Sequence, residues 1–410
     1  MEKLLIIGIN TRSLLNSASK LNFCTYSTSY FFTADSKRIY KEKHVLKQIP
    51  GKSCGIFEED YNPEKLLELS LEFMEEVDKI ILSGISPNIF KGNYKKFRKK
   101  IIGNHDVDTV ENKYKFYKKI RNDFLVPKTY KIDYDHIDEI VDILNQHSDT
   151  SFITKPLQGS GGYGVKYLDY TKKHYFNDSY FENYFSEYEG ETFLFQEFIE
   201  GDNISSSVLS TKKQAQNIIN SKMLTESNFG ENNFKYSGNI VPYTNILKSN
   251  TNSANEINDK EIKDISEKII SKFSLVGSNG VDMIIKNDKN KNEEIYIIEA
   301  NPRFQGTYEC VEKVLGINLL DAHIKAYDGE LINIPNTNGY SMKKIIYTKE
   351  RIKVGDLFID NVYDIPYNGV IIEKDQPLST IISYDKNIKN TKNKLKKAIF
   401  DVNKNIYSYH

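Results

Sequence analysis

The sequence contains 410 residues, more than a single hydrophobic core ordinarily serves, so two or three closely associated domains are expected. Lysine plus arginine and aspartate plus glutamate both number 56, and the resulting net charge of zero excludes a global attraction to nucleic acid or anionic membranes. No run reaches the roughly 18 apolar residues of a membrane span. We therefore expect neither a nucleic-acid partner nor a membrane partner.

The cysteines and the first residues bear on the cellular compartment. Cys24, Cys54 and Cys310 are widely separated and form no Cys-x-x-Cys pair, which argues against zinc or redox chemistry and favours reduced thiols. The apolar run within residues 1–12 is too short for a signal sequence, and no small-residue cleavage site follows it. We expect a cytoplasmic protein.

The first 105 residues alternate between strand and helix patterns. Residues 3–9 form a continuous apolar run, typical of a parallel strand that is covered on both faces. A segment opened by Pro63 has apolar residues near helical spacing. This alternation predicts an open α/β domain over residues 1–105. The further strands expected in it cover residues 23–28, 79–83 and 100–103.

The carboxyl end of the first strand is a candidate substrate site, because ligands of open α/β sheets bind where parallel strands end. Asn10 and Arg12 follow this strand, and Gly84 follows a later one. Arg12 offers a fork of donors suited to a carboxylate or phosphate. The alternative is that Arg12 pairs with a nearby acid and only orders the first loop.

Residues 106–330 contain segments of helical and of strand period. The polar stretch 287–293 is interpreted as the turn of an antiparallel pair, and the low-complexity stretch 245–260 as a mobile surface loop. The expected helices cover residues 112–121, 137–144 and 262–273, and the expected strands 152–155, 193–198, 281–286 and 294–299. Beyond residue 335, strands are expected at 343–348 and 369–372 and a basic, solvated helix at 391–403.

A glycine-rich loop follows the expected strand 152–155. Its glycines, at 159, 161, 162 and 164, permit positive φ and let successive N–H groups point into one concavity that suits phosphate oxygens. Lys155 would add a positive charge beside them. The loop lacks the Gly-Lys-Ser/Thr ending of a Walker A motif and the apolar strand of a dinucleotide fingerprint.

A second polar cluster lies in the antiparallel pair. Glu299 and Asn301 alternate along one strand, so their oxygens share a face and suit Mg²⁺. Asp282 on the partner strand supplies a second carboxylate, and Arg303 is placed to meet a transferring phosphoryl group. The alternative, a surface strand with solvated acids, conflicts with the apolar runs that flank these residues.

These features together resemble the ATP-grasp superfamily in order and spacing, over roughly residues 105–330. The tail, with Asp364-Ile365-Pro366, resembles the extension of the carboxylase-like and carboxylate–amine ligase branch, and the opening residues 8–12 resemble an uncharacterised archaeal group in it. The resemblance implies a mixed α/β and α+β fold. Its expected parts are an open parallel pre-ATP-grasp domain (1–105), an ATP-grasp domain (106–330) with a flap subdomain (about 125–197) and a metal-binding subdomain (about 198–330), and a small β-rich C-terminal extension (331–410).

The same resemblance implies ATP and Mg²⁺ as cofactors, with Mn²⁺ as an alternative metal, and assigns roles to individual residues. Asp202 and Asn203 are both candidates for the ribose contact, and neither is the glutamate that is usual in the family. The implied nucleotide contacts are Lys113, Lys155, Gly159, Ser160, Gly161, Gly162, Tyr163, Gly164, Gln196, Glu197, Phe198, Ile199 and Asp202 or Asn203; the implied metal ligands are Asp282, Glu299 and Asn301; the implied catalytic residues are Lys155 and Arg303.

The expected function is an ADP-forming ligase that activates a carboxylate as an acyl phosphate and couples it to an amine. No Ser/His/Asp or Cys/His set competes with this interpretation. A bicarbonate-using carboxylase and a nucleotide-binding regulator without turnover are the alternatives. The substrates are expected to be small molecules, with archaeal cofactor biosynthesis as one context, and a homodimer remains open.

Overall fold

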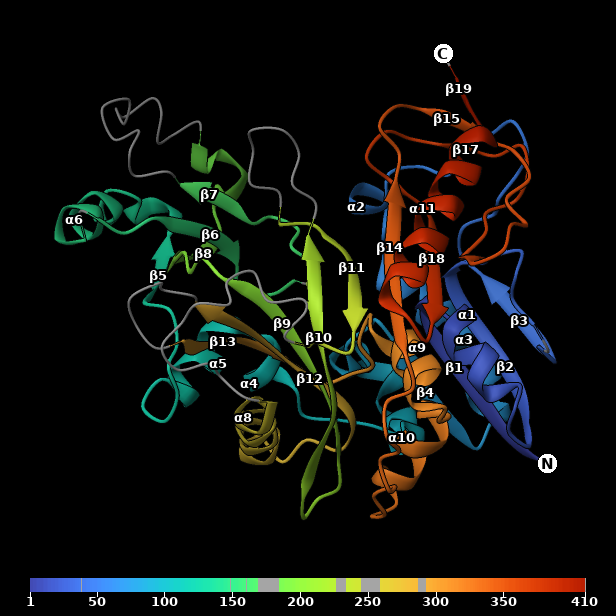
Figure 1. The fold of residues 1–410 in the computed structure, drawn as a ribbon, viewed down its shortest axis with the longest axis horizontal. Coiled ribbons are helices and arrows are strands. Elements are labelled where there is room, and N and C mark those ends of the chain that lie inside the picture. Colours follow the sequence, from blue (N-terminus) through green and yellow to red (C-terminus); the bar gives the residue numbers. More distant parts are fainter. Residues whose placement is uncertain are drawn as a thin grey trace.

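The computed structural model describes residues 1–37, 39–147, 149–159, 161–168, 184–225, 234–244, 259–286 and 293–409. Its larger sheets form three regions (Figure 1). A four-stranded antiparallel sheet lies at one end of the molecule, a four-stranded parallel sheet at the other, and a long eight-stranded antiparallel sheet connects the two.

The N-terminal domain is a four-stranded parallel sheet in the order β3-β2-β1-β4. Leu4 and Ile6 of β1 pack with α1 and α10, and Leu5 and Ile7 pack with α3 on the opposite face. Burial on both faces explains why the strand is apolar throughout. The elements are β1 (Glu2–Asn10), α1 (Arg12–Ala18), β2 (Phe23–Phe31), β3 (Lys41–His44), α2 (Phe57–Asp60), α3 (Pro63–Glu76), β4 (Lys79–Ser83) and the 3₁₀ helices η1 (Pro87–Ile89) and η2 (Gly92–Lys100).

The second region is a four-stranded antiparallel sheet in the order β5-β8-β6-β7, with α6 packed on its apolar face. Stacked Phe152 and Phe195 join β6 to β8 in this core. Strand β6 runs directly into the glycine-rich loop. The elements are α4 (Asp108–Glu111), α5 (Lys113–Ile120), β5 (Thr129–Asp133), η3 (Tyr134–His136), α6 (Glu139–Gln146), β6 (Phe152–Pro156), β7 (Lys166–Leu168), η5 (Ser186–Tyr188) and β8 (Thr192–Glu197).

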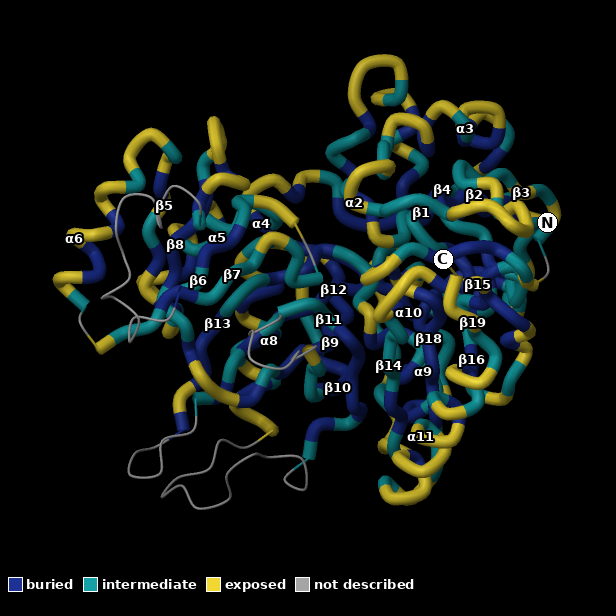
Figure 2. Tube along the Cα trace, turned by 90° about the horizontal axis from the view of Figure 1, so that it is seen from above, coloured by how far each residue is buried: buried dark blue, intermediate teal, exposed yellow. Residues whose placement is uncertain are grey.

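The central sheet has eight strands in the order β13-β12-β9-β10-β11-β14-β18-β16. Helices α5 and α8 cover one face through a shared apolar cluster that includes Phe116, Ile269 and Val281. Figure 2 shows that strands such as β9 are largely buried, while exposed residues gather on outer helices such as α11. The elements are β9 (Asp202–Ser210), β10 (Ala215–Thr225), β11 (Tyr236–Val241), α8 (Asp259–Lys272), β12 (Gly277–Lys286), β13 (Glu294–Asn301), α9 (Tyr308–Leu315) and α10 (Leu319–Tyr327).

The strands after residue 331 are divided between the central sheet and a small sheet of their own. Strands β14, β18 and β16 extend the central sheet, and only β15, β17 and β19 make a small sheet of their own. Helix α11 packs on β18 and β14. The elements are β14 (Tyr340–Tyr347), β15 (Ile352–Val354), β16 (Val362–Tyr363), β17 (Ile371–Ile372), β18 (Pro377–Asp385), α11 (Ile388–Lys404) and β19 (Ile406–Ser408).

The mixed fold class is confirmed, as is the antiparallel pairing of β12 with β13. The strand expected at residues 100–103 is wrong. Residues 92–100 form a 3₁₀ helix, and only Ile101 bridges to Ile80 before the chain turns at Gly103, whose φ is +147°. With two apolar residues between the helix and the turn, no ladder can form.

Two other expectations fall mainly outside the described residues, namely the surface loop at 245–260 and the turn at 287–293. The three cysteines are free thiols. In the described parts of the chain, no helix combines the length and the apolar character that crossing a bilayer requires.

Candidate active site

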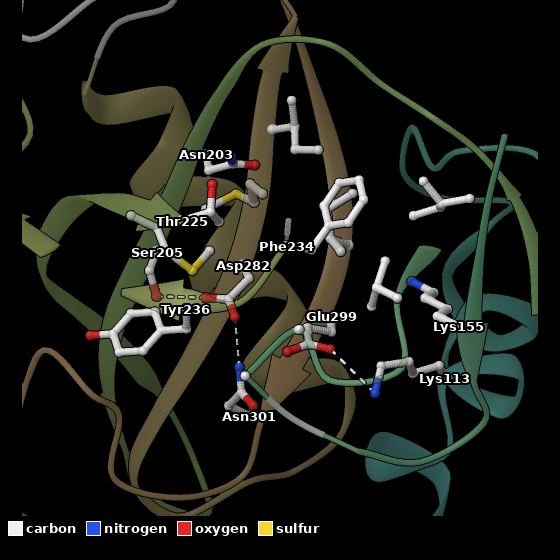
Figure 3. Close-up of a pocket in the computed structure, with 18 of the residues that line it drawn as sticks. Lys113, Lys155, Asn203, Ser205, Thr225, Phe234, Tyr236, Asp282, Glu299 and Asn301 are labelled. Atoms are coloured by element: carbon white, nitrogen blue, oxygen red, sulfur yellow. Dashed lines mark hydrogen bonds and ion pairs between the residues drawn. The ribbon is translucent and has the colours of Figure 1, made fainter. Parts of the chain in front are cut away.

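A pocket of about 520 Å³ lies between the antiparallel sheet and the central sheet. Figure 3 shows Lys113 and Lys155 on one side of it and Asp282, Glu299 and Asn301 on the facing strands. The two groups come from segments that are far apart in the sequence. The pocket is therefore a product of how the two sheets pack.

The acidic side of the pocket is built from paired strands. Asp282 of β12 lies opposite Glu299 of β13, and a register irregularity next to this pair leaves Ile298 without a cross-strand partner. Such a bulge re-aims the neighbouring side chains. The Asn301 amide donates to Asp282 Oδ2 at 2.9 Å, and the Ser205 hydroxyl donates to Asp282 Oδ1 at 2.5 Å.

The two carboxylates titrate differently because their neighbours differ. Loss of hydration and the charge of Glu299 raise the pKa of Asp282 well above its usual value, against the donors Ser205 and Asn301. Burial also raises the pKa of Glu299. The positive charges of Lys113 and Lys155, with further donors, outweigh this effect and hold the pKa below its usual value. A divalent cation would relieve the repulsion between the two acids.

Oxygen donors from two carboxylates and one amide are the set that suits Mg²⁺, so the residues present fit a hard cation. Among the described residues, no group of three or more His, Cys, Asp or Glu side chains is arranged to hold a metal. The proposed metal site has two carboxylates, from Asp282 and Glu299, and its third ligand is the amide oxygen of Asn301.

Two lysines face these acids. The Lys113 ammonium lies 3.6 Å from Glu299 Oε2 and donates to the Gly159 carbonyl at 2.6 Å. Lys155 is 4% exposed, and burial together with the charge of Lys113 lowers the pKa of its ammonium group to about 7. Arg303 lines the same pocket, and within the described residues its guanidinium makes neither a hydrogen bond nor an ion pair. It is available to an anion.

The glycine-rich loop packs over the pocket. Gly161 accepts a backbone hydrogen bond from Tyr236, and a Cβ at Gly162 would lie 1.9 Å from the Phe234 carbonyl oxygen, so the close approach requires glycine there. The Lys235 ammonium lies 4.9 Å from the centre of the Tyr163 ring. Ser160 lies outside the described residues, and Gly164 does not line the pocket.

The two ribose candidates point in opposite directions because they are adjacent on β9. Asn203 lines the pocket. Asp202 is 2% exposed and forms an ion pair with Lys222, with Nζ and Oδ1 2.8 Å apart. Only Asn203 is therefore carried into the proposed site. The segment that connects the two sheets, with Gln196, Glu197, Phe198 and Ile199, lines the pocket as a whole.

The residues assigned to the substrate lie elsewhere. Asn10, Arg12 and Gly84 do not line the pocket. Arg12 is 1% exposed and is held by Glu309 and Asp364 at 2.6 and 2.7 Å. This arrangement is the alternative that the sequence left open, in which the arginine pairs with acids, and it leaves no free donor fork for a ligand.

Several polar residues of the pocket were not anticipated from the sequence: Ser205, Thr225, Tyr236, Asn239, Gln305 and Thr307. The run of three serines between Ile204 and Val208 of β9 was the available signal. Nothing local marked Tyr236 or Asn239, which reach the pocket from β11.

The chain is similar to several known proteins. Residues 110–307 match the ATP-grasp domain. An uncharacterized protein of Methanocaldococcus jannaschii is 30% identical over 393 residues, which is 94% of this chain and 89% of that protein. The tyramine–L-glutamate ligase of Methanocaldococcus fervens is 37% identical over 119 residues, 28% of this chain and 32% of that enzyme.

Among solved structures, the biotin carboxylase domain of the Hydrogenobacter thermophilus 2-oxoglutarate carboxylase superposes with a TM-score of 0.70 at 15% identity. The match covers 97% of this chain and 89% of that chain, whose crystal contains MgADP, ADP and bicarbonate. The shared fold thus extends beyond the matched domain to both ends. From the domain match and the nearly full-length relative, the chain belongs to the ATP-grasp family, a family of ligase-type, ATP-dependent enzymes.

Proposed function

We propose that this protein is an ADP-forming ligase that activates a carboxylate with ATP and joins it to an amine. The observation that carries the proposal is the convergence, in one pocket, of two lysines beside a glycine-rich loop, an unpaired arginine and a pair of acids with an amide. Phosphoryl transfer depends on positioning and charge neutralisation rather than on a protein nucleophile, and this is what such a set provides.

In the proposed reaction, an oxygen of the substrate carboxylate attacks the γ-phosphorus of ATP, and the bond to the β-phosphate oxygen breaks. The products are an acyl phosphate and ADP. The amine then attacks the acyl carbon, loses a proton, and displaces inorganic phosphate to form an amide. Mg²⁺ held by Asp282, Glu299 and Asn301 would neutralise the phosphate oxygens.

The other residues of the pocket have separate roles in binding ATP and in excluding water. Lys113 and Lys155 hold phosphate oxygens, and Arg303 faces the transferred group. The packing of the glycine-rich loop against residues 234–236 limits the access of water to the acyl phosphate. Phe198 and Ile199 offer an apolar surface and backbone groups to adenine, and Asn203 offers an amide to the ribose.

The proposal that the reaction joins a carboxylate to an amine is supported by the relative whose name describes the ligation of tyramine to L-glutamate. The test is ADP release over a panel of carboxylates with and without amines, followed by the mass of the product. Bicarbonate belongs in the panel, since ADP release that depends on bicarbonate alone would favour a carboxylase. ADP release that no carboxylate stimulates would contradict the proposal.

Replacing Lys155 by Ala is expected to weaken ADP binding by about 1.5–3 kcal/mol, the value of a charge-assisted hydrogen bond, or roughly 10-fold to 150-fold in Kd. Calorimetric titration measures the change. Lys131 is the matched control because it is an exposed lysine of β5, a strand of the same antiparallel sheet. Equal affinities for wild type and Lys155→Ala would remove Lys155 from the site.

Nucleotide binding is also expected to take up a proton at pH 8. The lowered pKa of about 7 leaves Lys155 mostly neutral in the free protein, and phosphate beside it favours the ammonium form. Affinity therefore falls as the pH rises above 7. The observed binding enthalpy should vary with the ionisation enthalpy of the buffer, and this variation should vanish in Lys155→Met.

A further inference from the structure

The pocket face of the central sheet carries two adjacent rows of side chains across three strands. Ser205, Asp282 and Glu299 form one row, on β9, β12 and β13. In the next row Ser207 lies opposite Gly280, which lies opposite Asn301. The middle position of the second row therefore has no side chain.

Gln305 occupies that gap. It belongs to the segment that follows Arg303 and folds back onto the sheet, and a Cβ at Gly280 would lie 1.7 Å from its Nε2. Ser207 donates to Gln305 Oε1 at 3.0 Å, and Gln305 Nε2 donates to the Ser205 oxygen at 2.9 Å. Flipping the amide would turn Oε1 toward the Ser205 oxygen, whose one proton is given to Asp282, so the contact with Ser205 fixes the orientation of the amide.

The hydrogen bonds form a chain with one direction. The Ser205 hydroxyl has a single proton, which it gives to Asp282 Oδ1, so it can receive from Gln305 only as an acceptor. The chain runs from Ser207 through Gln305 and Ser205 to Asp282. The segment that bears Arg303 is thus connected to a carboxylate of the proposed metal site.

We propose that Gln305 and Ser205 are positioning residues that fix the Asp282 carboxylate for the metal and tie the Arg303 segment to it. The inference rests on the proposed function, since it concerns that function's metal site. Partners of this kind orient the atoms that touch a metal, and their removal costs about 10-fold to 100-fold in metal affinity.

The test measures Mn²⁺ affinity in the presence of saturating ADP, by the electron paramagnetic resonance signal of free Mn²⁺. Ser205→Ala is expected to raise the Mn²⁺ Kd by about 10-fold to 100-fold, and Gln305→Ala by about 10-fold. Ser205→Thr keeps the hydroxyl and should retain a Mn²⁺ affinity close to that of wild type. Binding of ADP without metal should be unchanged in all three variants.

Gly280→Ala offers an independent approach, because its methyl group would lie 1.7 Å from Gln305 Nε2 and so displaces the amide, while the four hydrogen-bonded residues keep their own side chains. It should reproduce the effect of Gln305→Ala, and the double variant should be no worse than either single variant, as expected when both changes break one contact.

Ser206→Ala is the matched control. Ser206 is the next residue of β9, faces the opposite side of the sheet, and donates to Asn220 at 2.7 Å, so its loss should lower stability without changing Mn²⁺ affinity. Unchanged Mn²⁺ affinity in Ser205→Ala and Gln305→Ala overturns the inference and leaves the proposed function intact. Failure of the wild type to bind ADP at all overturns both.

Discussion

Replacing Arg12 by Ala is expected to lower the free energy of unfolding by about 3–5 kcal/mol, the cost of removing one partner from a buried ion pair. The guanidinium forms a bidentate pair with Glu309 and contacts Asp364, and Asp35 lies 3.5 Å away. Without it, three half-buried acids lose their shared cationic partner. Chemical denaturation followed by circular dichroism gives the value.

The same network of hydrogen bonds explains why the loss of stability in Arg12→Ala is expected to affect several segments of the chain. Asp364 has a φ of +55°, an unusual value for a residue with a side chain, and its backbone N–H donates to Asp35 at 3.1 Å. Arg12 thus joins the N-terminal domain, helix α9 and the turn after β16. Removing it should loosen three segments together.

Arg351→Ala is the control, since Arg351 makes a surface ion pair with Glu373 and should change stability by less than about 1 kcal/mol. The competing hypothesis, in which Arg12 anchors a substrate, makes the opposite prediction. It requires an unchanged melting temperature and unchanged ADP affinity with a raised KM for the substrate.

Replacing Glu299 by Gln is expected to reduce ADP release by more than about 100-fold, because losing a direct metal ligand should cost more than losing a residue that only orients one. The fold should tolerate the change. Gln has the same shape, and the lost attraction to Lys113 is offset by the lost repulsion from Asp282. Steady-state ADP release across a Mg²⁺ series, with the melting temperature of the same sample, measures both effects.

Glu294→Gln provides the comparison, since Glu294 is an exposed glutamate at the far end of the same strand, β13. It should retain full activity. Normal ADP release by Glu299→Gln at ordinary Mg²⁺ concentrations would remove Glu299 from the metal site, whereas loss of activity together with a large fall in melting temperature would assign it a structural role.

Some features could be predicted from the sequence because they depend on local periodicity. The two-sided burial of β1 follows from its uninterrupted apolar run, and the shared face of Glu299 and Asn301 follows from the alternation of side chains along a strand. The glycine-rich loop after Lys155 could also be predicted from the local sequence, because glycine is the residue that readily adopts the positive φ values of such a loop.

Other features depend on which segments meet, and local patterns do not contain that information. Arg12 and its partner Asp364 are 352 positions apart, so a terminal arginine looked as much like a ligand anchor as like a structural residue. The order of the central sheet, which incorporates strands from residues 340–385, is likewise a matter of long-range pairing.

By itself, the sequence determined the fold class, most of the helices and strands, and the residue types that suit phosphate and a hard cation. Only the tertiary structure decided that Asn203 rather than Asp202 faces the pocket, that Gln305 fills the gap above Gly280, and that Arg12 is enclosed by acids. The physical reason is that the chemistry of a side chain is local, while its partners and its exposure to water are set by packing between segments distant in the chain.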